Sequence, residues 1–289
     1  MTRRGRNILT SDSPEIRQAD NHVHTEWSWD ASTGSMERSC ETAQALGLPS
    51  VAFTDHADFT DWAFPGQRRE NAVVRVIDTH ARSGYLDAEG YWECLERCRA
   101  RYPQVRILSG VELGESHVFA AEAAALTGAR QWDRVLGSLH SLPVGGVLHY
   151  APALLKDGAP EDIMRRYLAE TLRMLKQSSL FSILAHIDYP MRAWPKSARP
   201  FDAADYEEEY RAVLKALAES DRVLEINTAG PWPAAGVVEW WREEGGGAVS
   251  FGSDAHEPGA IAKDFRRAAA MAEACGFRPG RDSADFWRR

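Results

Sequence analysis

The chain alternates between short apolar runs and longer segments with the periodicity of an amphipathic helix. Seven apolar runs predict β-strands, at residues 19–24, 50–54, 105–111, 134–139, 181–185, 222–227 and 248–252. Helical patterns cover residues 35–46, 89–101, 116–127, 161–177, 204–218, 233–244 and 260–275, and a small hairpin or turn is expected over 144–150. Because strands that alternate with helices form parallel sheets covered by those helices, the pattern predicts an α/β fold.

The domain organisation predicted from the chain is simple. No change in composition separates one part from another, so we expect a single domain over residues 18–289. The polar residues 1–17 are expected to form a flexible N-terminal arm. Residues 57–87 lack a clear periodicity, and a loop of that length in a compact domain is usually functional or mobile.

Candidate functional side chains stand at the ends of the predicted strands. His22 and His24 are separated by one residue, as are Asp254 and His256, and positions i and i+2 of an extended segment point the same way. Six of the seven predicted strands carry a His, Asp or Glu at the carboxyl end, where β/α barrels build their active sites. The full set is His22, His24, Asp30, His56, Glu112, His140, His186, Asp254 and His256. Any one of them could be a cap or a buried histidine, but the gathering of the set at one end of the sheet favours a site.

The composition excludes several classes of function. A chain of 289 residues with 44% hydrophobic residues can build the core of a one-domain barrel. The formal net charge of −8 argues against a nucleic-acid-binding surface spread over the protein. We expect neither a membrane span nor a signal peptide, because no apolar run has the required length or position. The four cysteines form no C-x-x-C pair, which favours reduced thiols in a cytoplasmic protein.

The nine candidates have the chemistry of metal ligands, because Asp and neutral His commonly bind zinc, manganese and iron. One ion needs about three or four protein ligands, so nine candidates suit two or three ions with a bridging carboxylate and a bridging hydroxide. Such polynuclear centres serve chiefly the hydrolysis of phosphate esters. Three divalent ions, less the charges of Asp30, Glu112, Asp254 and one hydroxide, leave a site of about +2 that complements a phosphate dianion. Glu225 and Asn227 are equally suited to supporting the ligands or to a structural role.

The motifs around these residues are Asn21-His22-Val23-His24-Thr25, Thr54-Asp55-His56, Gly110-Val111-Glu112, Gly137-Ser138-Leu139-His140, Leu184-Ala185-His186 and Gly252-Ser253-Asp254-Ala255-His256. In this order they resemble the successive motifs of the polymerase and histidinol phosphatase (PHP) superfamily. The resemblance covers residues 20–256, which is most of the chain. It implies a distorted seven-stranded (β/α)7 barrel, similar to a TIM barrel, with a trinuclear metal centre.

Carried over residue by residue, the resemblance divides the nine side chains among three divalent ions, which could be zinc, iron or manganese. The implied sets are His22, His24, Glu112 and Asp254 for the first ion, Glu112, His140 and His186 for the second, and Asp30, His56 and His256 for the third. Glu112 would bridge the first two ions, and Glu112, Asp254 and His256 are the implied catalytic residues. Asp30 stands where many members have His, and both side chains can bind a metal.

Within the superfamily the chain most resembles the monofunctional histidinol-phosphate phosphatases, by its size and by the stretch Gly-Ser-Leu-His-Ser at 137–141. The implied reaction is the hydrolysis of L-histidinol phosphate to L-histidinol and phosphate, a step of histidine biosynthesis, by attack of a metal-bridging hydroxide. The sequence departs from the family pattern directly after His186, where Ile187, Asp188 and Tyr189 stand in place of an expected stretch similar to Pro-Asp-Leu.

Four basic side chains are candidates for binding the phosphate or the leaving group of a small-molecule phosphate ester. Arg192 and Lys196 follow the fifth predicted strand, whereas Arg68 and Arg69 lie in the loop over 57–87. Arginine suits this role because its guanidinium can bind phosphate through two parallel hydrogen bonds. We therefore predict substrate contacts for Arg192, Lys196 and Arg68.

Three other functions remain open. A phosphodiesterase or nuclease on the same centre would favour a basic groove, against which the net charge of −8 counts. An amidohydrolase also uses His-x-His on its first strand, but it usually bridges its ions with a lysine, and here Glu112 takes that place while His56 and His256 would be surplus. A binding or scaffold module with an inactive site would not need nine intact ligand-type residues. The chain has no Walker A, G-x-S-x-G or H-E-x-x-H motif, so nucleoside triphosphate binding, serine hydrolysis and zincin chemistry lack their signals.

Overall fold

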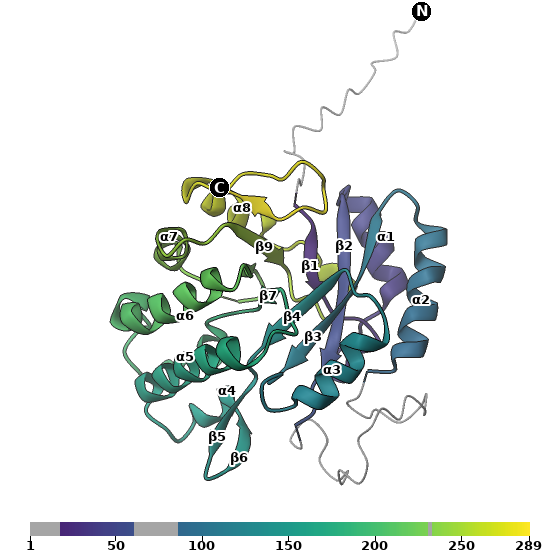
Figure 1. Ribbon diagram of the computed structural model, residues 1–289. Coiled ribbons are helices and arrows are strands. Elements are labelled where there is room, and N and C mark those ends of the chain that lie inside the picture. The colour runs from purple at the N-terminus through teal and green to yellow at the C-terminus, as the bar shows by residue number, and fades with distance from the viewer. Residues whose placement is uncertain (1–17, 61–85, 231–232) are drawn as a thin grey trace, which may run out of the picture.

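The computed structural model describes residues 18–60, 86–230 and 233–289 (Figure 1). The predicted arm at 1–17, most of the predicted loop at 57–87 and the candidate Arg68 lie outside the described residues. The strands are β1 (Asp20–Val23), β2 (Ser50–Ala57), β3 (Arg106–Gly114), β4 (Arg134–Ser138), β5 (Ser141–Val144), β6 (Val147–Tyr150), β7 (Ile183–Leu184), β8 (Val223–Asn227), β9 (Ala248–Gly252) and β10 (Trp287–Arg288). The α-helices are α1 (Met36–Leu46), α2 (Ala88–Arg101), α3 (Ala120–Ala129), α4 (Ala151–Leu154), α5 (Pro160–Gln177), α6 (Glu207–Glu219), α7 (Ala235–Glu243) and α8 (Phe265–Ala274), and the 3-10 helices are η2 (Tyr189–Ala193), η3 (Ala203–Tyr206) and η4 (Pro258–Ala260).

The main sheet of the described residues has the strand order β1-β2-β3-β4-β7-β8-β9-β10 and curls on itself (Figure 1). All neighbours pair in parallel except β10, which runs antiparallel to β9. The segment after β9 returns to β1, because Val23 pairs in parallel with Ala255 and the amide of His24 donates to the carbonyl of Ala255 at 2.8 Å. This contact brings together the two ends of the row of parallel strands. The predicted distorted seven-stranded β/α barrel is therefore confirmed.

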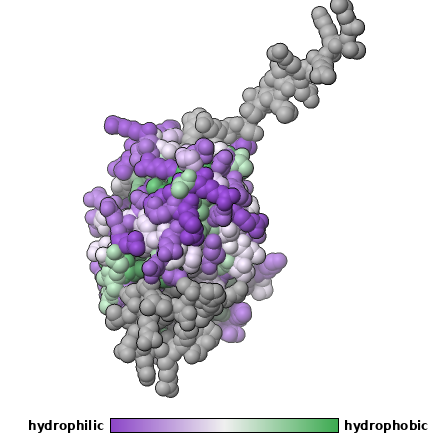
Figure 2. All heavy atoms as spheres, turned by 90° about the vertical axis from the view of Figure 1, so that its right-hand side faces the viewer, coloured by the Kyte–Doolittle hydropathy of each residue, from purple (hydrophilic) through white to green (hydrophobic). Residues whose placement is uncertain are grey.

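Helices cover the outside of the curled sheet, with α1 and α2 on one flank and α5, α6 and α7 on the other (Figure 1). Strand β2 is buried along its whole length, as expected for a parallel strand that has side chains packed on both of its faces. Figure 2 looks onto the flank of α1 and α2, where the described surface is mostly hydrophilic. None of the helices in the described ranges is long and apolar enough to cross a membrane.

Capping residues fix the limits of α1. The side chain of Ser35 accepts a hydrogen bond from the amide of Arg38, which satisfies one of the free donors of the first turn. At the other end Gly47 adopts a left-handed backbone with φ of 66°, and its amide donates to carbonyls of the last turn. The polar face of this helix points outward, while Met36, Cys40 and Ala43 are buried against the sheet.

Two strands are longer than the hydrophobic pattern predicts. Strand β2 continues through His56 to Ala57, and β3 continues through Glu112 to Gly114, so both candidate ligands lie within strands rather than after them. The prediction ended these strands at the first charged residue, but polar side chains are tolerated inside a barrel strand when they point into a shared site. The extra pairing, with His56 beside Glu112, fixes the relative position of the two side chains.

Other boundaries differ where the backbone breaks the helical pattern. Helix α3 begins at Ala120, four residues later than predicted. The expected helix over 260–275 is confined to α8, because Ala262 and Asp264 adopt φ of 54° and 56°, which no right-handed helix allows. Strand β10 was not predicted at all, because its two residues are too short for a periodic signal.

Strands β5 and β6 form the predicted small hairpin, which begins at Ser141 rather than at 144. Its turn consists of Gly145 and Gly146, with φ of 58° and 83°. Positive φ at both turn residues is the geometry of the tight hairpin turns that match the strand twist. The hairpin starts directly after His140, so its base belongs to the region of the candidate site.

Candidate metal centre

The closure between β1 and the segment after β9 brings two predicted ligand pairs into contact. The Nε2 atoms of His22 and His24 lie 3.0 Å apart, and Oδ1 of Asp254 lies 3.1 Å from Nε2 of His24 and 3.6 Å from Nε2 of His22. The amide of Asp254 donates to the carbonyl of His22 at 2.7 Å. Asp254 has a φ of 53°, which is unfavourable for a residue with a side chain and is typical of functional sites.

Glu112 lies between two groups of histidines. Its Oε2 atom is 3.3 Å from Nε2 of His22 and 3.4 Å from Nε2 of His24. Its Oε1 atom is 2.8 Å from Nε2 of His186 and 3.3 Å from Nε2 of His140. The two oxygens of one buried carboxylate thus face different sets of nitrogen atoms, which is the arrangement that a bridging ligand requires.

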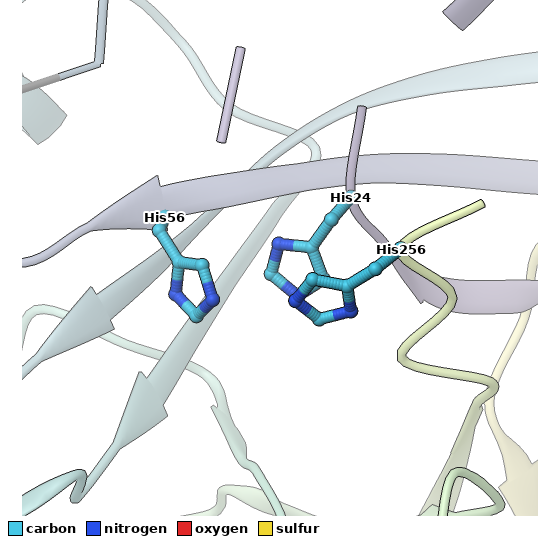
Figure 3. Close-up of side chains that lie close together, drawn as sticks. All are labelled: His24, His56 and His256. Atoms are coloured by element: carbon cyan, nitrogen blue, oxygen red, sulfur yellow. The ribbon is translucent and has the colours of Figure 1, made fainter. Parts of the chain in front are cut away.

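His56, Asp30 and His256 form the more exposed side of the cluster. The rings of His56 and His256 both stack on the ring of His24, with 4.2 Å between centroids in each case (Figure 3). Oδ2 of Asp30 lies 3.4 Å from Nε2 of His56 and 3.1 Å from Nε2 of His256. His56 also reaches Glu112, since its Nδ1 atom is 2.9 Å from Oε2, so it lies between the predicted second and third sets.

All nine predicted ligands therefore gather in one cluster. Among the described residues, four triplets have ligand atoms within 4.8 Å of one another: His22, His24 and Asp254; His22, Glu112 and His186; His56, Glu112 and His140; and His24, His56 and His256. The first two triplets share His22, and Glu112 connects the second with the third. The clusters could hold several metal ions side by side.

Outer hydrogen bonds determine which nitrogen of each histidine faces the cluster. The bonds at the outer nitrogen Nδ1 run from His22 to Glu225 at 2.7 Å, from His24 to Ser28 at 2.9 Å, from His140 to Asp58 at 2.9 Å and from His256 to the carbonyl of Asp254 at 2.9 Å. Carboxylate and carbonyl oxygens only accept, and the hydroxyl of Ser28 already donates to Asp55 at 2.7 Å, so we assign a proton to Nδ1 in these rings. When such a ring is neutral, its Nε2 has the lone pair. A metal-binding histidine needs this arrangement.

The residues present fit a group of bound cations. The Nε2 atoms of His22 and His24 face each other at 3.0 Å, and Oδ1 of Asp254 lies within 3.6 Å of both. Oε2 of Glu112 and Nδ1 of His56 are buried and lie 2.9 Å apart, yet neither forms a hydrogen bond with any described residue. A cation that replaced the protons between these atoms would be held by coordination bonds to their nitrogen and oxygen atoms.

The directions of the pKa shifts indicate that the buried carboxylates favour positive charge around them. Burial alone would raise the pKa of Glu112, but the charges of His22 and His56 outweigh it, and the pKa lies well below its ordinary range. Burial would lower the pKa of His22 and of His56, yet the carboxylates around them raise both pKa values well above the usual value. Burial, with the charges of His256 and His56, lowers the pKa of His24 to about 3. Protons supply part of this charge, and metal cations can replace them on binding.

Two supporting carboxylates were not predicted from the sequence. Asp58 accepts from His140 and from the indole of Trp29 at 3.0 Å, and its position two residues after His56 was the signal that could have found it. Glu115 accepts from the amides of His140 and Ser141, both at 2.6 Å, and has a φ of 42°. No sequence pattern predicts that Glu115 binds these two amides.

Glycine at position 114 is required by the close approach of these groups. A Cβ atom there would lie 2.0 Å from Oδ1 of Asp58. Since real Cβ contacts are never so short, any side chain would displace Asp58 and break its hydrogen bond to His140.

The sequence left two roles open for Glu225. In the structure its carboxylate accepts from the amide of His186 at 2.8 Å and bonds with Nδ1 of His22 at 2.7 Å, so it contacts two of the predicted ligands.

The predicted substrate-binding residues differ in their placement. Arg192 donates through Nη2 to Asp254, and to Oδ1 of Asn227 at 3.2 Å, so its guanidinium lies directly at the cluster. The ion pair with Asp254 outweighs burial and raises the pKa of Arg192. Lys196 is exposed and makes no hydrogen bond or ion pair with any residue that the structure describes, and Arg68 lies outside the described ranges.

Comparisons with known proteins agree with this geometry. Residues 20–229 match the family model described as "PHP domain". A relative from Clostridium acetobutylicum named "Probable histidinol-phosphatase" is 26% identical over 273 residues, which cover 90% of this chain and 94% of that protein. The histidinol-phosphatase of Lactococcus lactis is 26% identical over 215 residues, which cover 74% of this chain and 72% of that protein.

A solved structure has the same fold. It is histidinol phosphate phosphatase from Lactococcus lactis in complex with zinc, L-histidinol and phosphate; the TM-score is 0.76 at 22% identity, over 91% of this chain and 95% of that one. The fold similarity extends over the whole barrel, and the family match covers most of the chain. The chain therefore belongs to the PHP domain family.

Proposed function

We propose that the protein is a metal-dependent phosphomonoesterase and that its substrate is L-histidinol phosphate. The observation that carries the proposal is the convergence of buried histidine and carboxylate ligand atoms beside the guanidinium of Arg192. Phosphoryl transfer depends mainly on positioning and on positive charge around the transferred group, and this site offers both. The relatives named histidinol-phosphatase, and the Lactococcus lactis structure that holds zinc, L-histidinol and phosphate, support the choice of substrate.

The nine side chains would hold the ions in three sets, of which the first two share Glu112. The proposed sets are His22, His24, Glu112 and Asp254, then Glu112, His140 and His186, and finally Asp30, His56 and His256. Divalent ions bound there would lower the pKa of a coordinated water and polarise the phosphoryl oxygens. Zinc, iron and manganese all suit this donor set.

The catalytic candidates have separate tasks in this proposal. Glu112 sets the spacing between the ligand groups, because each oxygen faces its own set of histidines. Oδ1 of Asp254 faces His22 and His24, and its Oδ2 accepts a hydrogen bond from Arg192. His256 and Asp30 have side chains 33% and 29% exposed, so the substrate would enter on their side of the cluster.

Arg192 is the best-placed residue for binding the phosphate group. Its Nη2 atom is engaged by Asp254 and Asn227, whereas its Nε and Nη1 atoms form no hydrogen bond with any residue in the described ranges. A guanidinium that keeps free donors beside a metal cluster can bind a phosphate oxygen without giving up its anchor. Lys196 and Arg68 remain proposed contacts of the substrate.

A phosphate-release assay tests the proposal. Protein reconstituted with zinc, manganese or iron is offered L-histidinol phosphate, other phosphomonoesters and dinucleotides, and its metal content is measured alongside. We expect more than one equivalent of metal per chain, and a kcat/KM for L-histidinol phosphate at least about tenfold above the others. Cleavage of diesters alone would replace the proposal by a phosphodiesterase, and equal rates on all monoesters would remove the substrate assignment.

A further inference from the structure

Tyr189 connects the histidine cluster with Arg192. Its ring lies against the rings of His186 and His140, with centroids 4.6 and 5.1 Å apart. The guanidinium carbon of Arg192 lies 4.7 Å from the centroid of the same ring. From there the guanidinium reaches Asp254, so one aromatic ring contacts two predicted metal ligands and the cation that pairs with a third.

The local backbone produces this stacking. Tyr189 and Arg192 both belong to the 3-10 helix η2, in which side chains three residues apart lie one above the other. The face of an aromatic ring attracts a cation. Tyr189 stands where this sequence departs from the Pro-Asp-Leu-like pattern, so an aliphatic side chain in its place would leave Arg192 without this support.

Tyr150 holds Tyr189 from the other side. The two phenol oxygens are 3.0 Å apart, and the rings meet edge to face at 6.1 Å. Tyr150 is the last residue of β6 and pairs with Ser141, while the amide of the next residue, Ala151, donates to the carbonyl of His140 at 2.8 Å. These contacts fix the base of the hairpin relative to His140. The hydrogen bond to Tyr150 then fixes the position of the Tyr189 ring.

We propose that Tyr189 is a positioning residue, which holds the guanidinium of Arg192 at the metal cluster for phosphate binding, and that Tyr150 anchors it from the hairpin. This inference rests on the proposed phosphatase function. Arginine has many rotamers, and a guanidinium that is ordered before the substrate arrives loses less entropy when phosphate binds. The ring therefore contributes to the affinity for the phosphate group rather than to the chemical step.

Replacement of Tyr189 by leucine and by phenylalanine separates the ring from the phenol oxygen. In Tyr189→Leu we expect the KM for L-histidinol phosphate and the inhibition constant of inorganic phosphate to rise together by about tenfold, with kcat changed by less than about twofold. Tyr189→Phe keeps the ring and should recover most of the lost affinity. Trp240→Leu is the matched control, because it removes the stacking of Arg211 on Trp240 (5.5 Å) between α6 and α7, and it should leave both constants unchanged.

A double-mutant cycle tests whether Tyr189 acts through Arg192. In the Arg192→Ala background, Tyr189→Leu should weaken phosphate binding no further, because the ring has lost the group that it positions. An equal loss in both backgrounds, or a fall in kcat with unchanged affinity, would overturn the inference.

Calorimetry separates the test of this inference from the test of the proposed function. The binding of inorganic phosphate, which involves no turnover, is measured for the four metal-loaded proteins of the cycle: the wild type, Tyr189→Leu, Arg192→Ala and the double variant. If the wild type hydrolyses no phosphomonoester, the proposed function fails, and the calorimetric cycle still decides the role of Tyr189. If the wild type binds no phosphate, or binds it with an affinity independent of Tyr189, the inference fails.

Discussion

Glu112 determines more of the site's geometry than any other single residue, because its two oxygens face different groups of histidines. Glu112→Gln keeps the size of the side chain but removes the negative charge that cations need. We expect this variant to lose metal and to lose at least about 100-fold in kcat, with the fold retained. Metal analysis, phosphate release and circular dichroism on the same samples measure the three effects.

Asp30→His is the matched comparison for Glu112→Gln. Asp30 lies on the more exposed side of the cluster, and imidazole can bind a metal as carboxylate does. We expect this variant to stay within about tenfold of the wild-type kcat. The assignment of roles is wrong if Glu112→Gln turns over normally, or if Asp30→His is the more damaging change while both remain folded.

Asp58 contacts two of the proposed ligands, since its Oδ1 bonds with His140 and its Oδ2 lies 3.4 Å from Nδ1 of His56. Its carboxylate accepts from Nδ1 of His140, so Asp58→Ala would free that ring to rotate and to change tautomer. We expect metal affinity to fall by about 10- to 100-fold, measured by competition with a chelator, and to recover partly in Asp58→Asn, which keeps an acceptor oxygen. Unchanged affinity in Asp58→Ala would show that His140 does not depend on this bond.

Sequence reasoning works at the residue scale where spacing alone places a side chain. His22 with His24, and Asp254 with His256, are two residues apart on extended segments, which is enough to predict that each pair faces one spot. The role of Glu115 could not be predicted, because it depends on a φ of 42° and on two amides from another strand's end. Arg192 was predicted as a phosphate contact, but its stacking on Tyr189 requires the 3-10 geometry of η2.

At the scale of elements, the apolar runs predicted which segments are strands but not where β2 and β3 end. Charged residues usually close a strand, and His56 and Glu112 do not, because neighbouring strands surround both side chains. The burial of polar groups inside a strand is a property of the closed sheet rather than of the local sequence. The pairing of β10 could not be predicted for a different reason, because a strand of two residues has no periodic signal.

A buried histidine between two elements gives the stability of the fold a pH dependence. His117 lies in the connection between β3 and α3. Its Nε2 atom is 2.8 Å from Oε1 of Glu170 on α5, and its Nδ1 atom is buried without a hydrogen-bond partner among the described residues. Burial lowers the pKa of His117, although Glu170 opposes the shift. Below about pH 6.5 the unfolded chain therefore binds a proton that the folded chain does not, and the free energy of unfolding falls as the pH falls.

His117→Gln removes this titration and keeps a polar side chain. Urea unfolding at several pH values between about 5.5 and 7.5, at constant metal concentration, should show a steeper loss of stability for the wild type than for the variant. Any loss of metal at low pH affects both proteins, so the difference between the two slopes isolates His117. Equal slopes would mean that His117 titrates alike in the folded and unfolded chains.

On the scale of the whole molecule, the barrel closure could be predicted only through the family resemblance. The alternation of strands and helices indicates a parallel sheet but does not distinguish an open sheet from a curled one. The contact of Val23 with Ala255 decides the question, and it joins residues that are far apart in the sequence. The same contact assembles the centre, because it places Asp254 beside His22 and His24.

Metal removal is therefore expected to weaken the whole barrel. The proposed ligands come from β1, β2 and β3 and from the segments after β1, β4, β7 and β9, so bound ions would hold strands together around the sheet. Without the ions the carboxylates repel one another. Metal present at about 100 times its dissociation constant stabilises the folded state by about 2.7 kcal/mol. For a chain of 289 residues that corresponds to a fall in Tm of roughly 4–5 °C for each ion removed by a chelator. Addition of zinc should restore the Tm, and Glu112→Gln should respond to neither treatment. If chelation strips the metal from the wild type and the Tm stays the same, the strands are held without help from the ions.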